Sequence, residues 1–218
     1  MNVLVACEES QEVCKAFRAK GHRAFSCDIQ PCSGGHPEWH IKGDVLPLLN
    51  GNCTFKTADT HTHTQAGQWD LIIGFPPCTY MTNAGAVRMR VKGEINQDRL
   101  AKAMDAKAFF MRMFNADCPK VAIENPTPMK IVGLPVPSTV IQPYEFGHPY
   151  SKRTCLWLRG LPPLFPTEIV EEHTPWVNGG CKDAHGNYRR FQGRGERDPK
   201  TRSKTFPGIA KAMADQWG

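Results

Sequence analysis

The chain has 218 residues and a mass of 24.4 kDa, which predicts one domain, or one domain with a small lobe, that is long enough to bury a core. Hydrophobic residues make up 40% of it and charged residues 22%, and no apolar run approaches the roughly 18 residues of a membrane helix. This composition excludes a disordered polymer and an integral membrane protein. No secretory signal is recognised at the start, and nine cysteines are an odd number. We therefore expect a reduced, cytoplasmic protein.

The net charge of +6 and the isoelectric point near 8.9 favour a polyanionic partner. Residues 182–204 carry five of the six net charges, because eight basic residues there face three acidic ones. The rest of the chain is close to neutral.

The first third of the chain reads as a strand, a helix and a second strand. Residues 3–7 are an apolar run of buried-strand length, and residues 11–20 place Val13 and Phe17 four apart on one helical face. Residues 23–27 form the next apolar run, before Asp28. A short extended piece before Asp44 and a polar, threonine-rich insert over 54–68 follow.

Further buried strands are predicted at 69–73 and 121–123, on either side of a helix over 98–117 whose apolar residues are Leu100, Met104, Ala108 and Met111. Strands that alternate with helices predict an α/β fold with a mostly parallel, doubly wound sheet.

The last third changes in character. Nine of the eighteen prolines fall in residues 126–166, which excludes long helices there and leaves one strand at 154–158. The basic, glycine-containing stretch is expected to be a mobile loop, and residues 208–216 a closing helix with Ile209 and Met213 four apart. We expect a main domain of residues 1–165 and 205–218, with a basic region over 166–204.

Acidic or thiol side chains follow the predicted strands, where ligands of open α/β sheets bind. They are Glu8, Glu9, Asp28, Asp44, Cys78 and Glu124. The turn Cys7-Glu8-Glu9-Ser10-Gln11 has no glycine to cradle a pyrophosphate, and its negative charge favours a cationic ligand such as a sulfonium. Asp28 is placed to accept hydrogen bonds from ribose hydroxyls. Structural alternatives stay open: a turn at Asp28, a helix N-cap at Asp44, and helix-terminus charges at Glu8 and Glu9.

Two prolines fix the backbone before Cys78, which favours a rigidly held nucleophile. Glu124 follows the neighbouring strand, and a protonated carboxyl there can donate to a ring nitrogen of a planar substrate. A buried structural thiol and a loop-capping carboxylate are the alternatives. Cys27, Cys32, His36 and His40 have spacings that also admit a zinc site, although a strand and a loop explain them as well.

The order of segments resembles the DNA cytosine C5 methyltransferases. The resemblance rests on VLVACEESQEVCKAFRAKGHRAFSCDI, GDV, DLIIGFPPCTYMT, VAIENPTPM, SKRTCLWL and the helix after TFPGIAKAMA, over most of residues 1–160 and again over 205–217. It implies a compact, phage- or prophage-like member with a Rossmann-like class I methyltransferase fold and a reduced target-recognition region. In that family Cys78 would attack C6 of cytosine and Glu124 would hydrogen-bond N3. Arg153 matches the second arginine of the family's Arg-x-Arg element.

The resemblance also implies S-adenosylmethionine as methyl donor, double-stranded DNA as partner, no metal and no partner protein. The implied cofactor residues are Ala6, Cys7, Glu8, Glu9, Ser10, Asp28, Ile29, Asp44, Val45, Gly74 and Pro76. The implied DNA-binding residues are Tyr80, Arg189, Arg190, Arg194, Arg197, Lys200 and Arg202. Because the target base must leave the duplex, Tyr80, Phe191 or Gln192 is expected to fill the gap or support the flipped ring.

Three other functions remain open from the sequence. One is an amino-methyltransferase acting on N4 of cytosine or N6 of adenine. Such enzymes need an oxygen acceptor at the position that Phe75 occupies here, which argues against this function. The others are C5 methylation of a free nucleotide and a catalytically silent nucleic-acid-binding protein. In the silent protein, Cys78→Ala would leave every activity unchanged.

Overall fold

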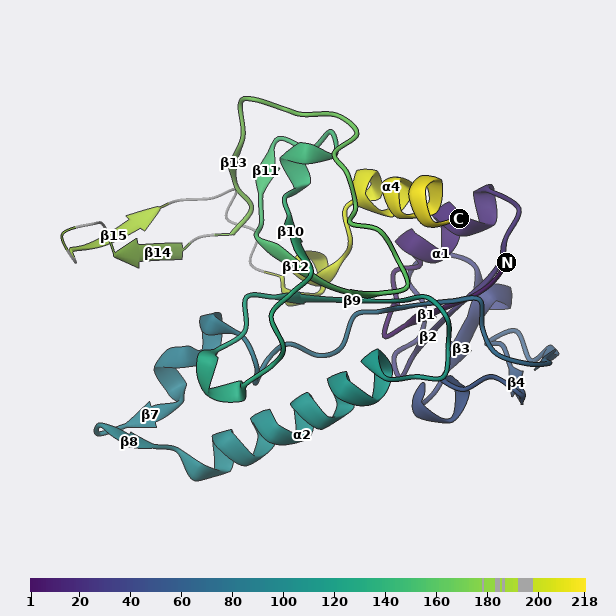
Figure 1. The fold of residues 1–218 in the computed structure, drawn as a ribbon, viewed down its shortest axis with the longest axis horizontal. Helices are drawn as coiled ribbons and strands as arrows, with labels where there is room; N and C mark the ends of the chain where they lie inside the picture. The colour runs from purple at the N-terminus through teal and green to yellow at the C-terminus, as the bar shows by residue number, and fades with distance from the viewer. Residues whose placement is uncertain (178, 183–184, 186, 192–197) are drawn as a thin grey trace.

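A seven-stranded sheet forms the centre of the computed structural model, which describes residues 1–177, 179–182, 185, 187–191 and 198–218 (Figure 1). The strand order is β10-β12-β9-β6-β1-β2-β3. From β3 to β9 all neighbours pair in parallel, whereas β12 is antiparallel to both β9 and β10. The predicted α/β fold with a mostly parallel sheet is confirmed. The strands are β1 (Asn2–Ala6), β2 (Arg23–Asp28), β3 (His40–Lys42), β6 (Leu71–Gly74), β9 (Val121–Pro126), β10 (Thr139–Ile141) and β12 (Thr154–Arg159).

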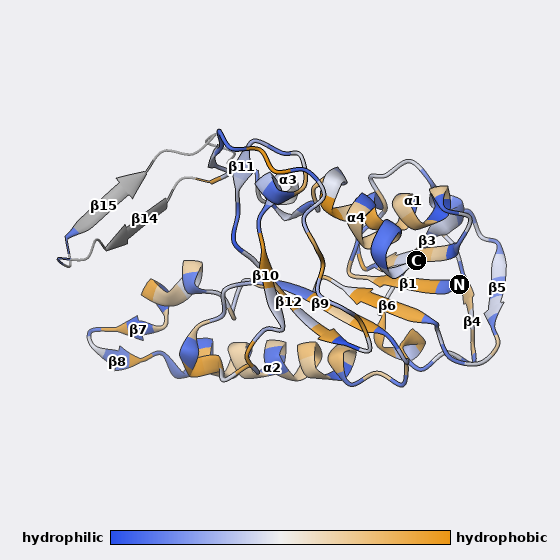
Figure 2. Ribbon diagram, turned by 45° about the horizontal axis from the view of Figure 1, so that its top comes forward, coloured by the Kyte–Doolittle hydropathy of each residue, from blue (hydrophilic) through white to orange (hydrophobic). Residues whose placement is uncertain are grey.

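Helices cover both faces of the sheet (Figures 1 and 2). Alternate residues of β1 point to opposite sides, so Leu4 joins the core cluster that includes α2 (Gln97–Phe114), and Val3 joins the one that includes α1 (Glu12–Ala19) and α4 (Pro207–Trp217). The α1 and α4 helices also pack against each other. Because both faces are covered, the central strands are apolar throughout rather than alternating.

The buried face of α2 differs from the predicted one. Ala103, Phe110 and Met113 are fully buried, whereas Ala108 is exposed and Leu100, Met104 and Met111 are half-buried. The ring of Phe110 packs edge-on against Trp157 of β12, with centroids 5.0 Å apart. The large aromatic side chain, which the apolar spacing overlooked, sets the face that meets the sheet.

Short hairpins replace two of the expected irregular segments. The threonine-rich insert forms β4 (Cys53–Lys56) and β5 (Thr62–Gln65), and the basic stretch forms β14 (Gly179–Lys182) and β15 (Tyr188–Phe191) rather than a loop throughout. A third hairpin, β7 (Arg90–Val91) with β8 (Glu94–Ile95), precedes α2. The short helices are η1 (Pro37–Trp39), η2 (Leu46–Leu48), η3 (Asn83–Arg88), η4 (Lys130–Val132), η5 (Pro143–Glu145) and α3 (Pro199–Ser203).

The first part of the expected basic region packs on the main body. There β13 (Thr174–Pro175) pairs in parallel with β11 (Tyr150–Ser151), and Trp176 is buried with its ring edge-on to Tyr150 and to Phe206. Trp176 and Val177 therefore share the core on which α4 lies.

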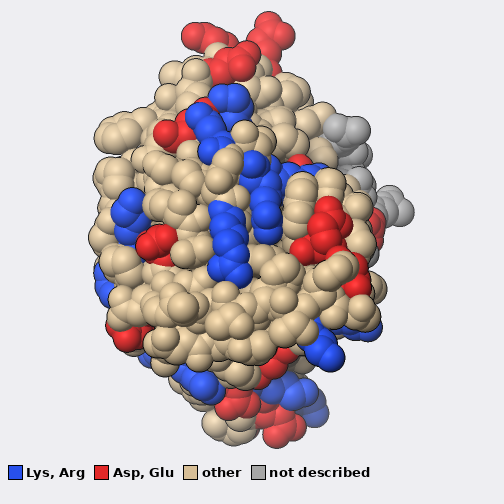
Figure 3. Space-filling view, turned by 90° about the vertical axis from the view of Figure 1, so that its right-hand side faces the viewer, with Lys and Arg blue, Asp and Glu red and all other residues tan. Residues whose placement is uncertain are grey.

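Surface charge is mixed on the side that carries the N-terminus and β4. Figure 3 shows acidic and basic side chains interspersed there, unlike the one-sided charge of residues 182–204. Of the helices described, none combines the length and the hydropathy that crossing a bilayer requires.

Candidate active site

The strand order reverses between β1 and β6, with β2 and β3 on one side and β9 on the other. In an open α/β sheet the crevice at such a reversal, outside the carboxyl ends of the strands, is where ligands bind. Gly74 pairs with Ala6 on one side and with Ile123 on the other. The chain segments that follow β1 and β6 thus leave the sheet at one level beside Glu124, and the sequence-predicted residues gather along this edge.

The turn after β1 has the backbone of a glycine turn without glycine. Cys7 and Gln11 both have left-handed backbones, with φ of 59° and 60°, a conformation that is costly for residues other than glycine. The Gln11 side chain offsets this cost, because its Oε1 accepts from His36 N at 3.1 Å and its Nε2 donates to His36 O at 2.8 Å. The turn is therefore fixed by side-chain hydrogen bonds rather than by glycine.

Glu8 is committed to the start of α1. Its two carboxylate oxygens accept from Val13 N at 2.7 Å and Cys14 N at 3.2 Å, so it satisfies helix-terminal donors in the way of an N-cap. Burial raises the pKa of Glu8 to about 7 against these hydrogen bonds. These contacts agree with the structural alternative for Glu8, in which its charge serves the N-terminus of a helix. Glu9 and Ser10 are buried beside it, and Glu9 O accepts from Ser33 N at 2.8 Å.

Asp28 and Asp44 both hold backbone turns with one oxygen. Oδ1 of Asp28 accepts from Gln30 N at 2.8 Å, and Oδ1 of Asp44 accepts from Leu46 N at 3.0 Å. Both carboxylates add to burial in raising the pKa of the Cys7 thiol to about 12, so their negative charge is felt at the β1 turn. This is the edge of the sheet where a ligand with hydroxyl donors and a positive charge fits.

Apolar residues accompany these aspartates. Ile29 is 75% exposed beside Asp28, whereas Val45 and Ala6 are buried in the core. Gly74 is explained by packing, because a Cβ on it would lie 2.9 Å from Ile123 Cδ1. Of these residues, only Ile29 presents an open apolar surface to a ligand.

The segment around Cys78 is clamped to β9 and its extension on both sides of the thiol. Before it, Asn125 Nδ2 donates to Pro76 O at 3.2 Å. After it, Asn83 N donates to Thr127 O at 3.0 Å, and Met129 N donates to Met81 O at 2.7 Å. Cys78 O itself accepts from the amides of residues 81 and 82. The backbone of the Cys78 segment is consequently fixed relative to β9.

Charges of both signs act on this thiol. Burial and the Glu124 carboxylate raise the pKa of Cys78 above its ordinary value, and Lys152 and Arg202 offset only part of this rise. Burial also raises the pKa of Glu124, and Lys152 opposes that shift. A thiol, a carboxyl and an ammonium group therefore lie within electrostatic reach of one another. Burial favours the protonated form of the carboxyl, which can donate a hydrogen bond.

Asn125 and Lys152 were not predicted as site residues. Asn125 is fully buried, and its Oδ1 has no hydrogen-bond partner in the part of the chain that is described. Its position next to Glu124 in the sequence is the signal from which Asn125 could have been predicted. Lys152 lies between Ser151 and Arg153, and nothing in the sequence distinguishes its role from that of Arg153.

Arg153 and Tyr80 have other partners. Arg153 is exposed, and its Nε donates to Thr127 Oγ1 at 3.1 Å. The Tyr80 ring lies 5.1 Å from the Arg99 guanidinium and 5.6 Å from the Lys102 ammonium group, an arrangement that makes cation–π contacts.

The predicted DNA-binding residues are only partly described. Arg189 and Arg190 lie on β15 with Phe191, and Lys200 and Arg202 lie on α3. Arg194 and Arg197, like Gln192, fall outside the described residues.

The zinc alternative finds no support among the described residues, where no group of three potential ligands comes together. His40 is buried with Nδ1 2.9 Å from Ser26 Oγ and Nε2 2.9 Å from Gln30 O. Nδ1 of His36 lies 2.9 Å from Glu38 Oε1. Both histidines thus have protein partners.

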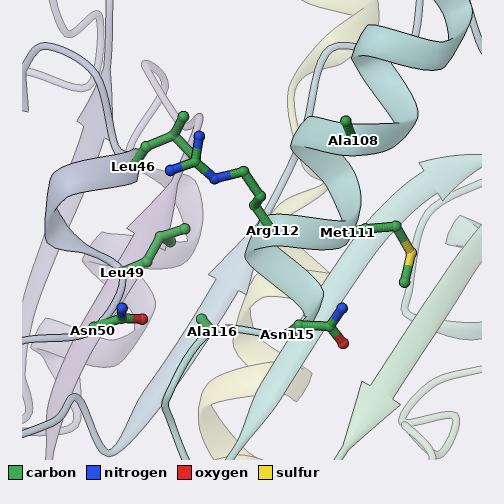
Figure 4. A pocket seen from close by; sticks show the side chains of 8 residues that line it. All are labelled: Leu46, Leu49, Asn50, Ala108, Met111, Arg112, Asn115 and Ala116. Carbon is green, nitrogen blue, oxygen red and sulfur yellow. The ribbon is translucent and has the colours of Figure 1, made fainter.

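Two open cavities lie away from the predicted residues. One of about 350 Å³ lies between η2 and the C-terminal half of α2, with Arg112 projecting toward Leu46 (Figure 4). Another of about 370 Å³ is lined by Arg18, Phe25 and Trp39, among others.

The sequence matches none of the protein-family models and none of the curated proteins with which it was compared. The chemistry of the residues themselves is therefore the basis for a functional assignment.

Proposed function

We propose that this chain is a DNA cytosine C5 methyltransferase that transfers a methyl group from S-adenosylmethionine through a covalent adduct of Cys78. The observation that carries the proposal is that Cys78, in the segment after β6, acts together with Glu124 of the neighbouring parallel strand β9, to which Asn125 ties that segment by its hydrogen bond to Pro76 O. A rigid thiol beside a carboxyl matches what addition to a pyrimidine ring needs.

The two groups have complementary parts in the reaction. Burial raises the pKa of Glu124, which favours the protonated carboxyl that donates to N3 and draws electron density from the ring. The Cys78 thiolate then adds to C6, and the electron pair displaced toward C5 takes up the methyl group. Loss of the C5 proton and expulsion of Cys78 restore the ring.

The methyl donor would be held at the edge formed by β1, β2 and β3. The fit is electrostatic, because Asp28 and Asp44 direct negative charge to the Cys7 turn, which suits a sulfonium and ribose hydroxyls and disfavours a phosphate. The exposed side chain of Ile29 offers an apolar contact for a purine ring. Bound there, S-adenosylmethionine would supply an electrophilic methyl group. We accordingly place the fold in the Rossmann-like class I methyltransferases.

DNA is the proposed substrate because positive charge is concentrated in residues 182–204. The backbone carbonyl of Arg202, in that region, accepts a hydrogen bond from Lys152 Nζ at 3.0 Å, and Arg202 acts electrostatically on Cys78. Basic side chains so placed would bind phosphates and position a duplex without reading its bases.

The test is mass spectrometry of nucleosides from DNA of cells that lack cytosine methylation and express this chain. We expect 5-methylcytosine with the wild type and with Cys53→Ala, a control thiol on the β4 hairpin, and none with Cys78→Ala. Detection of N4-methylcytosine or N6-methyladenine that persists in Cys78→Ala would reject the covalent mechanism. The absence of any modified base from the wild-type sample would reject DNA methylation altogether.

A second experiment tests the adduct directly. On DNA with 5-fluorocytosine in place of cytosine, the fluorine at C5 cannot leave as a cation, so the Cys78 adduct should accumulate after methyl transfer. A denaturation-resistant protein–DNA complex is expected with the wild type and absent with Cys78→Ala.

A further inference from the structure

Three fully buried polar side chains, Gln11, Ser26 and His40, connect the turn after β1 with β2 and β3. Ser26 and His40 are direct neighbours in the parallel pairing of β2 with β3, and His40 Nδ1 lies 2.9 Å from Ser26 Oγ. Gln11 Nε2 donates to the same oxygen at 3.3 Å. Polar groups buried this deeply are costly unless they are paired. The three side chains therefore form one hydrogen-bonded chain inside the protein, and the reaction proposed above does not use it.

The geometry assigns the protons of the His40 ring. Nε2 lies 2.9 Å from the backbone O of Gln30, and because a carbonyl oxygen can only accept, Nε2 carries a proton. On the other side of the ring, the Ser26 hydroxyl oxygen lies closer to His40 Nδ1, at 2.9 Å, than to Trp39 O, at 3.4 Å. In the neutral ring, Nδ1 therefore accepts from Ser26 while Nε2 donates to Gln30.

The hydrogen bond from His40 fixes the turn that carries Asp28. Both backbone groups of Gln30 are held, because its N donates to Asp28 Oδ1 at 2.8 Å and its O accepts from His40 Nε2. Ile29, between Asp28 and Gln30, is the exposed side chain of this turn. The shape of the turn thus depends on a proton held at one buried ring nitrogen.

Gln11 ties the turn after β1 to the same chain. Its side chain makes two hydrogen bonds with the backbone of His36, in the loop that follows β2. This loop approaches Gln11 closely, since a Cβ on Gly34 would lie 2.5 Å from Gln11 Cβ and 2.5 Å from Ser10 O. The turns after β1 and β2 are consequently held by one buried network.

We propose that His40 is a positioning residue of the methyl-donor site. Its Nε2–H holds Gln30 O and thereby keeps Asp28 and Ile29 in the arrangement that accepts the ribose and the purine of S-adenosylmethionine. This assignment rests on the proposed function, because that function makes the turn a donor site. Ser26 selects the tautomer of the ring. Because His40 and Ser26 are fully buried, neither contacts the donor itself.

The experiment compares two matched replacements of His40 in the folded chain. The amide nitrogen of a glutamine takes the place of Nε2, whereas that of an asparagine takes the place of Nδ1 and leaves no donor for Gln30 O. Calorimetric titration with S-adenosylhomocysteine should give a dissociation constant close to that of the wild type for His40→Gln, and one raised by about fivefold or more for His40→Asn. His63→Asn, on β5 and outside the network, is the control and should bind as the wild type does. Circular dichroism establishes that each variant is folded.

Two further measurements need no donor. NMR of the ring nitrogens at pH 8 should show the His40 ring of the wild type protonated at Nε2 and unprotonated at Nδ1. Hydrogen exchange of the amides of residues 29–36 should be faster in His40→Asn than in His40→Gln, because only the second retains a donor for Gln30 O.

Three results would overturn the assignment: wild-type affinity in folded His40→Asn, equal losses of affinity in both variants, or a wild-type ring protonated at Nδ1 alone. If His40→Asn does not fold, Ser26→Ala takes its place, and a single ring tautomer with unchanged affinity in that variant would overturn the assignment. A wild-type chain that does not bind S-adenosylhomocysteine would reject the proposed donor. Faster exchange in His40→Asn would then leave the positioning of the Gln30 turn standing, and equal exchange in the two variants would reject that as well.

Discussion

Cys7 and Cys78 both follow parallel strands at the same edge of the sheet, yet only carboxylates act on Cys7, whereas charges of both signs act on Cys78. Around Cys7, burial and the carboxylates of Asp28 and Asp44 all raise the thiol pKa, to about 12. Around Cys78, burial and Glu124 also raise the thiol pKa above its ordinary value, but two cations, Lys152 and Arg202, offset part of the rise. A strand-end position by itself does not make a thiol a nucleophile. The cations brought by residues far along the chain distinguish the two.

The largest expected difference is in reactivity. At pH 8 we expect iodoacetamide to alkylate Cys78 faster than Cys7, because both thiols are half-buried and the rate then follows the thiolate fraction. Peptide mass spectrometry of a time course on the folded protein measures both rates in one sample. Equal rates would mean that the charges near Cys78 do not set its reactivity.

Glu124→Gln should separate reactivity from catalysis. Glutamine cannot carry the negative charge that raises the pKa of Cys78, so alkylation at pH 8 should not become slower, while methylation should fall by about 100-fold or more through loss of the proton donor to N3. The two rates are measured by peptide mass spectrometry and by methyl incorporation into DNA. A variant in which both rates fall would indicate a structural role for Glu124.

Glu8 gives a smaller, pH-dependent effect on stability. Its pKa in the folded chain is raised to about 7 from an ordinary value of 4.5, so its contribution to stability is fully present below pH 4.5 and is lost as the pH rises through 7. Glu8→Gln should remove this slope, which is of the order of 1–3 kcal/mol. Urea unfolding at pH 5 and pH 8 measures it. Glu12→Gln, a half-buried carboxylate in the same helical turn, is the matched control and should keep the slope.

The sequence predicted the parallel strands and the position of Cys78 because both depend on local patterns: continuous apolar runs and prolines before a thiol. Sequence patterns did not predict elements whose structure depends on packing against residues distant in the chain. The buried face of α2 follows the contact of Phe110 with Trp157. The hairpin of residues 53–65 follows cross-strand pairs such as Phe55 with His63, and its apolar alternation, limited to Cys53 and Phe55, is too short to identify a strand.

The candidate site shows the same division. Glu8 was predicted as a cofactor residue, with a helix-terminus charge as the alternative, and its carboxylate oxygens accept from backbone amides of α1. Lys152 and Arg153 are both basic residues in the same segment, and only the fold shows that the first donates to Arg202 O and the second to Thr127 Oγ1. The direction of a side chain at the end of a strand depends on how that strand pairs with its neighbours, and a local sequence pattern does not predict this pairing.

The smallest expected effect concerns the backbone at Cys7, and it tests whether the two strand ends differ in shape as well as in charge. Because Cys7 has φ of 59°, Cys7→Gly should relieve about 1 kcal/mol of strain and lose a similar amount through the flexibility of glycine in the unfolded chain and the missing thiol contacts. Its free energy of unfolding should stay within about 1 kcal/mol of the wild type. Cys7→Val puts a β-branched side chain into the same left-handed backbone, so it should be less stable than Cys7→Gly by about 2 kcal/mol. Urea unfolding of both variants measures the difference, and equal stabilities would show that the turn after β1 is not left-handed in solution.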